Sequence, residues 1–97
     1  MYAVINHLHL TIPLDNLREP LAQEGVPLLA SLPGFRRFSL IKESENRGIA
    51  LILWDTEANA INGGREFGPT WFAQHVAPYL ASDQERTLGE IIVDHQV

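Results

Sequence analysis

The chain has 97 residues, a formal net charge of −5 and no cysteine. This length supports one domain with a single small core, and the lack of cysteine excludes a disulfide framework and thiolate chemistry. The seven basic residues are scattered, so the chain lacks the basic face typical of nucleic-acid-binding proteins. Its longest apolar run, Ile49–Trp54, has the length of a strand and cannot span a membrane. We expect one cytoplasmic domain over residues 1–97, with neither nucleic acid nor membrane as a partner.

The first expected element is a strand over Tyr2–Ile12, closed by Pro13, which cannot donate to a strand ladder. Successive side chains of a strand point to opposite faces. One face is therefore apolar except for Asn6, while His7 and His9 lie together on the other face. This separation makes Asn6 and the two histidines independent candidates for function.

A helical region is expected over Leu14–Leu32, because leucines recur there at roughly helical spacing. Asp15 is a candidate N-cap, and the region should kink near Gly25–Pro27, since proline removes a helical hydrogen bond. A second strand, Phe35–Glu43, then leads into a hairpin turn in which Gly48 is expected to adopt a positive φ.

The third strand, Ile49–Asp55, is apolar on both of its faces. A strand of this kind has to be covered on both sides. Helices in so short a chain can cover only one face of the sheet, so a second subunit is the simplest cover for the other. The sequence therefore predicts a homodimer.

Thr56 is a candidate N-cap for a short helix that Asn62-Gly63-Gly64 should break, and a further helix is expected over Pro69–Leu80. The last expected strand is Arg86–His95. The order β-α-β-β-α-β predicts an α+β, ferredoxin-like fold with a four-stranded antiparallel sheet and both helices on one face.

Three stretches carry a family resemblance: LPGFRRFSL, LILWDTEANA and WFAQHVAPYL. Through them, and over nearly its whole length, the chain resembles the antibiotic-biosynthesis-monooxygenase-like (ABM) domains of the dimeric α/β-barrel superfamily. The resemblance implies a homodimer whose bare sheet faces form a shared barrel, with a cleft between sheet and helices in each subunit. Enzymes of this group oxidise polycyclic aromatic substrates with O2, often without metal or flavin. A related branch degrades heme, and other members have no known activity.

The function that this resemblance implies first is a cofactor-independent monooxygenase, an oxidoreductase acting on a hydrophobic aromatic small molecule. Asn6 and His75 are the candidate catalytic residues. The Asn6 amide would hydrogen-bond the substrate oxyanion, and His75, whose ordinary pKa is near neutrality, would accept the substrate proton. Both residues also have structural interpretations, as a hydrogen-bonded buried amide and as a half-buried boundary histidine.

Four further residues are expected to line the cleft and bind the substrate. Trp71 precedes His75 by one helical turn, so the two rings can lie side by side. Phe72 would help to exclude water, and Leu8 and Trp54 lie on the expected strands. Core packing is the alternative role for both tryptophans.

Two alternative functions stay open. One is a non-catalytic dimeric module that binds a small apolar ligand or a partner protein. The other is heme binding, because the heme-degrading relatives carry matching residues at Asn6 and His75. Their tryptophan, however, lies further upstream, where this chain has Asn62-Gly63-Gly64, so no cofactor is expected, with heme as the alternative. No metal site is expected either, because His7 and His9 lack a predictable third ligand. They would pack in the dimer barrel or make its interface pH-sensitive.

Overall fold

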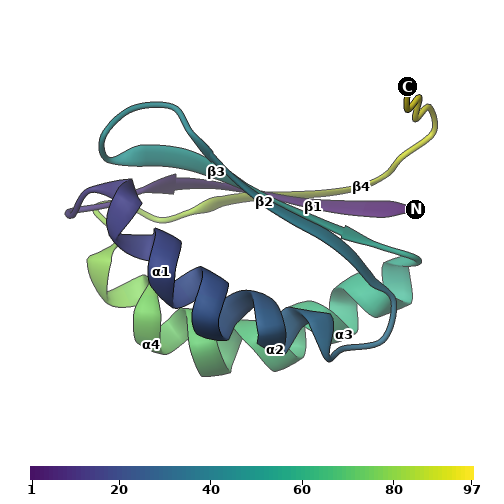
Figure 1. Cartoon of the computed structure of the whole chain (residues 1–97), viewed down its shortest axis with the longest axis horizontal. Coiled ribbons are helices and arrows are strands. Elements are labelled where there is room, and N and C mark those ends of the chain that lie inside the picture. Colours follow the sequence, from purple (N-terminus) through teal and green to yellow (C-terminus); the bar gives the residue numbers. More distant parts are fainter.

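The computed structural model describes all 97 residues and contains one four-stranded sheet and two helical arms. All neighbouring strands are antiparallel, in the order β2-β3-β1-β4. Both arms cover the same face of the sheet, and the other face stays bare (Figure 1). The predicted α+β, ferredoxin-like fold is confirmed. The strands are β1 (Tyr2–His9), β2 (Phe35–Lys42), β3 (Arg47–Trp54) and β4 (Glu85–Glu90).

The first helical arm, residues 14–30, changes its hydrogen-bonding pattern along its length and does not break. The Val26 N–H donates to the Leu21 carbonyl in a π-helical turn, just before Pro27, which has no N–H to donate. The expected kink is thus a widened turn. The arm comprises a 3-10 turn (Leu14–Leu17), α1 (Arg18–Pro20), the π turn (Leu21–Gly25) and α2 (Val26–Ala30).

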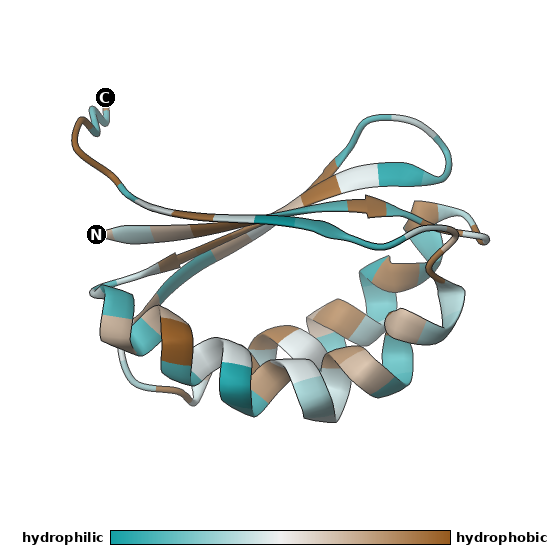
Figure 2. Cartoon of the chain, turned by 180° about the vertical axis from the view of Figure 1, so that it is seen from behind, coloured by the Kyte–Doolittle hydropathy of each residue, from teal (hydrophilic) through white to brown (hydrophobic).

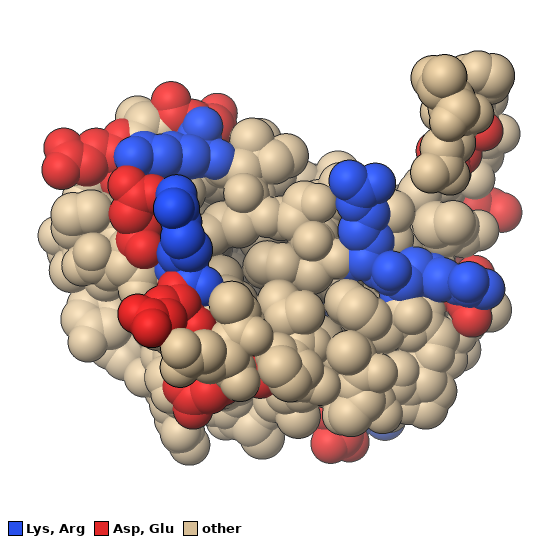
Figure 3. All heavy atoms as spheres, in the orientation of Figure 1, with Lys and Arg blue, Asp and Glu red and all other residues tan.

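Asp15 is not the N-cap of this arm, because Pro13 holds that position and Asp15 lies in the first turn. Its carboxylate instead ties the arm to the edge strand β2. Lys42 Nζ donates to Asp15 Oδ2 at 2.7 Å, and Arg18 Nη2 donates to Oδ1 at 3.2 Å. The hydrogen bond and the charge of Lys42, aided by the charge of Arg18, hold the pKa of Asp15 below its ordinary value. Acidic and basic side chains interleave at this end of the molecule (Figure 3).

We expect Asp15→Asn to lower stability near pH 7 and to leave it unchanged near pH 2. Because the folded-state pKa is depressed, the carboxylate stabilises the fold above the unfolded-state value of about 3.9, and this contribution is lost as the pH falls through the folded-state value. Urea unfolding midpoints at both pH values measure the difference. Glu45→Gln, a charge removal at the same end without an ion pair, is the control. A deficit of equal size at both pH values would contradict the prediction.

The second helical arm is continuous from Glu57 to His75, so the predicted break at Asn62-Gly63-Gly64 is wrong. Thr56 caps it as predicted, since its side chain accepts the Asn59 N–H at 3.1 Å. The two glycines allow close approach: a methyl group on Gly63 would overlap the Trp54 ring, and one on Gly64 would lie 2.7 Å from Arg86 Nη2. The arm comprises α3 (Glu57–Phe67), a π turn (Gly68–Phe72), α4 (Ala73–His75) and a 3-10 turn (Ala77–Tyr79).

Two strand predictions also need correction. The positive φ expected at Gly48 belongs to Gly34, at 77°, before β2. Gly48 lies inside β3, where a methyl group would collide with Leu14. The last strand ends at Glu90 and not at His95, because Glu90 pairs with Tyr2, the first residue of β1, and β1 has no further residue to pair with.

The core lies between the sheet and the two arms, and Trp54 at the end of β3 is only 1% exposed. The other face of β3 presents Ile49, Leu51 and Leu53, which are half-buried in a single chain. Hydrophobic stretches of the sheet therefore lack a cover on the side away from the arms (Figure 2). None of the helices has the length and hydropathy needed to cross a bilayer.

Candidate functional site

A mainly apolar cavity lies between the inner face of the sheet and the helical arms. The cavity together with the solvent-filled space at its mouth spans about 720 Å³, and 15 of its 21 lining residues are hydrophobic. The structure places five of the six predicted site residues in its wall: Asn6, Leu8, Trp54, Trp71 and Phe72. A cavity with this mainly apolar lining suits a small hydrophobic molecule.

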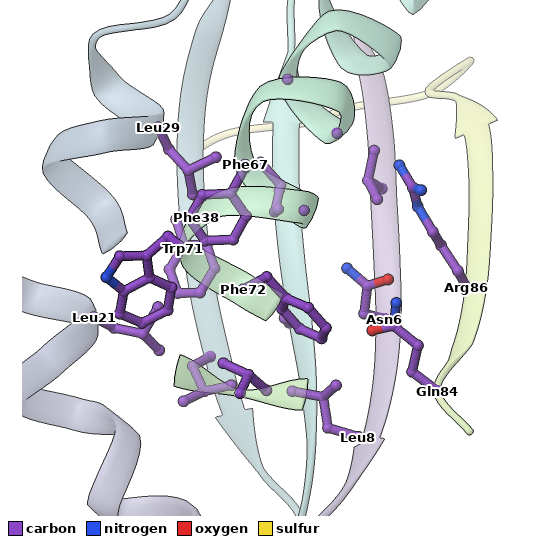
Figure 4. A pocket seen from close by; sticks show the side chains of 18 of the residues that line it. Asn6, Leu8, Leu21, Leu29, Phe38, Phe67, Trp71, Phe72, Gln84 and Arg86 are labelled. Atoms are coloured by element: carbon purple, nitrogen blue, oxygen red, sulfur yellow. The ribbon is translucent and has the colours of Figure 1, made fainter. Parts of the chain in front are cut away.

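Three buried polar atoms in this wall have no hydrogen-bond partner: Asn6 Oδ1, Gln84 Oε1 and Trp71 Nε1. Buried polar atoms are nearly always paired, because leaving one unpaired costs about 1–3 kcal/mol. Asn6 and Gln84 lie together on one side of the cavity, whereas the indole nitrogen of Trp71 points away from them on the other side (Figure 4). The two amides therefore mark a place where a bound molecule or water can complete the hydrogen bonds. In this structure Asn6 Oδ1 accepts no hydrogen bond from the chain.

The two orphaned amides belong to neighbouring strands. Asn6 on β1 lies opposite Arg86 on β4, and Gln84 immediately precedes β4 on the same face as Arg86. All three line the cavity on the side opposite Trp71 and Leu21 (Figure 4). Sequence reasoning missed Gln84 and Arg86. The alternation of β4, combined with its expected pairing to β1, was the signal that could have found them.

The remaining predicted residue, His75, does not line the cavity. Its ring stacks on Trp71, with centroids 4.5 Å apart and planes 10° from parallel, and Nδ1 lies 2.9 Å from the Trp71 carbonyl oxygen. Phe67 stacks on Trp71 at 5.5 Å. The predicted contact between Trp71 and His75 is thus confirmed, but Trp71 occupies the place facing the cavity and His75 lies behind it.

The cavity wall does not fit a heme group. It contains no histidine, cysteine, methionine or tyrosine that could ligate the iron. His75, which matches a residue of the heme-degrading relatives, has its Nδ1 against the Trp71 carbonyl and its Nε2 4.0 Å from Glu24. No axial ligand is therefore presented to the cavity.

His7 and His9 point to the face of the sheet away from the cavity, as the strand alternation predicted. His7 lies opposite Ile49 and Glu85 on the adjacent strands, and His9 lies opposite Arg47. Nowhere in the structure do three or more His, Cys, Asp or Glu side chains gather closely enough to hold a metal ion. The pair therefore lies in the expected dimer face and takes no part in the cavity.

No protein-family model and no curated protein sequence matches the chain. Solved structures do resemble it. SnoaB, a cofactor-independent oxygenase from Streptomyces nogalater, superimposes with a TM-score of 0.78 and 16% identity over 96% of this chain and 94% of that one. An antibiotic biosynthesis monooxygenase gives a TM-score of 0.76 and 15% identity over 96% and 100% of the two chains.

A third match has a bound ligand. A variant of MhuD with two manganese protoporphyrin IX molecules per active site gives a TM-score of 0.75 and 17% identity, with both chains covered completely. All three likenesses are close in structure and remote in sequence. The chain therefore shares the fold of these proteins.

Proposed function

We propose that this protein is a cofactor-independent monooxygenase that oxidises a hydrophobic aromatic small molecule in the cavity between sheet and arms. The observation that carries the proposal is the set of unpartnered polar atoms in an apolar wall, Asn6 Oδ1, Gln84 Oε1 and Trp71 Nε1. The resemblance of the fold to SnoaB, a cofactor-independent oxygenase, supports it.

The proposed reaction converts a polycyclic phenol and O2 into a quinone and water. The phenol loses its proton to solvent at the cavity mouth, and the electron-rich ring then transfers electrons to O2. A carbon–oxygen bond forms at the ring carbon opposite the hydroxyl. The resulting hydroperoxide loses water, so one oxygen atom enters the product and the other leaves as water. The substrate supplies all four electrons, and no further reductant is needed.

The Asn6 side chain is suited to stabilise both the deprotonated phenol and the hydroperoxide that follows it. An amide is both a donor and an acceptor, so Nδ2–H can bond the ring oxyanion while Oδ1 accepts the hydroperoxide O–H. Trp71 and Phe72 form apolar wall and keep water from the reactive ring. His75 reaches the site only through Trp71, so we assign it as a positioning residue that holds the indole.

We expect the protein to transfer one atom of isotopically labelled O2 to a polycyclic phenol, and Asn6→Ala to lower kcat about a hundredfold, as loss of an oxyanion donor does. Asn16→Ala, which removes an exposed asparagine of the first arm, is the control. His75→Ala should lower kcat without removing a limb of the pH profile. Loss of that limb would instead make His75 the proton acceptor.

The proposal fails if no phenol in the panel acquires labelled oxygen, or if Asn6→Ala turns over like the wild type while remaining folded. A protein that binds the phenols without consuming O2 would be the non-catalytic ligand-binding module.

We also propose that two copies of the chain pair through the bare sheet face. That face carries Ile5 on β1 and Ile49, Leu51 and Leu53 on β3, so its apolar part is continuous across two neighbouring strands. An uncovered apolar sheet face of this kind favours association.

A further inference from the structure

Arg86 is the one charged side chain in the wall of the cavity. Arg86 is exposed, and no carboxylate lies within 4.0 Å of its guanidinium; Arg37, Arg47 and Arg65 are likewise unpaired, whereas Arg18, Arg36 and Lys42 form ion pairs. On its own strand, Glu85 points to the opposite face of the sheet, and Glu90, on the same face, lies four residues away. A guanidinium beside an apolar cavity without an internal counter-ion is available to a ligand.

The second arm makes room for this guanidinium. Gly64 of α3 lies so close that a methyl group there would be 2.7 Å from Arg86 Nη2. Glycine inside a helix costs about 1 kcal/mol relative to alanine. Because Gly64 has no side chain, the Arg86 side chain can reach from β4 toward α3 at the edge of the cavity.

The atoms beside Arg86 restrict the ligand further. Asn6 lies directly opposite Arg86 on β1, and Gln84 lies two residues before it on the same face. The orphaned oxygens of both amides accept hydrogen bonds, so the complementary group is a hydroxyl or an N–H donor. A planar guanidinium binds a carboxylate with two parallel hydrogen bonds.

We propose that the ligand is an aromatic hydroxy-carboxylate, with its rings in the apolar cavity, its hydroxyl on Asn6 and Gln84, and its carboxylate on Arg86. This inference rests on the proposed function and names its substrate class. It adds Arg86 as the residue that selects an anionic substrate over a neutral one. Gly64 is a positioning residue, because it sets where the guanidinium lies.

The test is the binding of a hydroxynaphthoate, the matching naphthol and the matching naphthoate, followed by quenching of tryptophan fluorescence and by calorimetry. We expect the hydroxynaphthoate to bind about tenfold more tightly than the naphthol, as a charge-assisted contact at a partly exposed site provides. Arg86→Gln should remove that preference, so that the hydroxynaphthoate and the naphthol bind with equal affinity. Arg65→Gln, an exposed arginine of α3 that lines no cavity and makes no ion pair, is the control.

Gly64→Ala tests the geometry separately. Its methyl group can be accommodated by displacing the flexible end of Arg86, so the variant should fold with an equal or higher melting temperature. Its preference for the carboxylate should nevertheless fall severalfold. If Gly64→Ala keeps the full preference for the carboxylate, the space left by Gly64 does not position the guanidinium.

Three results would overturn the proposal. The first is equal affinity for hydroxynaphthoate and naphthol in the wild type. The second is an undiminished preference in Arg86→Gln. The third is a shift of the dimer equilibrium in Arg86→Gln with carboxylate affinity unchanged, which would assign the guanidinium to the subunit interface. In each case the cavity still binds the naphthol, so the proposed monooxygenase survives. Failure of all three probes to bind would instead remove the proposed function itself.

Discussion

Replacing Gly63 by alanine is expected to destabilise the fold by up to about 2 kcal/mol, a sizeable part of the 5–15 kcal/mol typical of a domain. The added methyl group would overlap Cζ2 and Cη2 of Trp54, a rigid ring that is 1% exposed and cannot move aside. Alanine gains about 1 kcal/mol of helix propensity over glycine, which is smaller than the cost of overpacking. Urea unfolding, followed by tryptophan fluorescence, measures the difference.

Gly68→Ala is the matched control in the same arm. Apart from its chain neighbours and the backbone of its own helix, no atom lies within 4 Å of the position that its methyl group would take, and its φ of −59° is helical. Pro69 follows it, and a side chain before proline disfavours helical backbone, which offsets the gain in helix propensity, so the variant should change the stability by less than about 1 kcal/mol. If Gly63→Ala is as stable as Gly68→Ala, the contact between α3 and Trp54 is looser than the structure indicates.

Much of the architecture follows from local sequence signals. The alternation of β1 and the two-sided apolarity of β3 predict the strands, and Thr56 predicts the start of α3. The prediction failed at Gly63 and Gly64, because local propensity treats glycine as a helix breaker. Here each glycine instead meets a partner from a distant strand, Trp54 or Arg86. Contacts of that kind cannot be seen in a local pattern.

The site was predictable to a similar degree. Strand parity places Asn6 and Leu8 toward the helices, and helical spacing places Trp71 beside His75. Spacing alone does not say which ring faces the cavity. The π turn at Gly68–Phe72 precedes α4, and Trp71, which lies within it, is the ring that lines the cavity. His75 stacks behind that ring. Gln84 lies outside the strand expected over Arg86–His95, which hid its shared face with Arg86.

Leu51→Glu is expected to convert a dimer into folded monomers. Leu51 lies at the centre of the bare face, opposite Ile5 on β1 and Ser39 on β2. In a symmetric dimer the substitution occurs twice in one interface, and each buried, unpaired carboxylate costs about 3–5 kcal/mol. The dimer dissociation constant should therefore rise more than a thousandfold, by the relation of about 1.4 kcal/mol to each factor of ten. Sedimentation equilibrium measures it.

Ile61→Glu separates an interface effect from a general effect of added charge. Ile61 is a 46% exposed residue of α3, on the side of the molecule away from the bare face, so this variant should remain dimeric. The monomer of Leu51→Glu should keep its fold, because Leu51 contributes to no part of the core between sheet and arms. A wild-type chain that is monomeric at micromolar concentration would leave Ile49, Leu51 and Leu53 in water and contradict the proposed pairing. A Leu51→Glu chain that stays dimeric would place the interface on another surface.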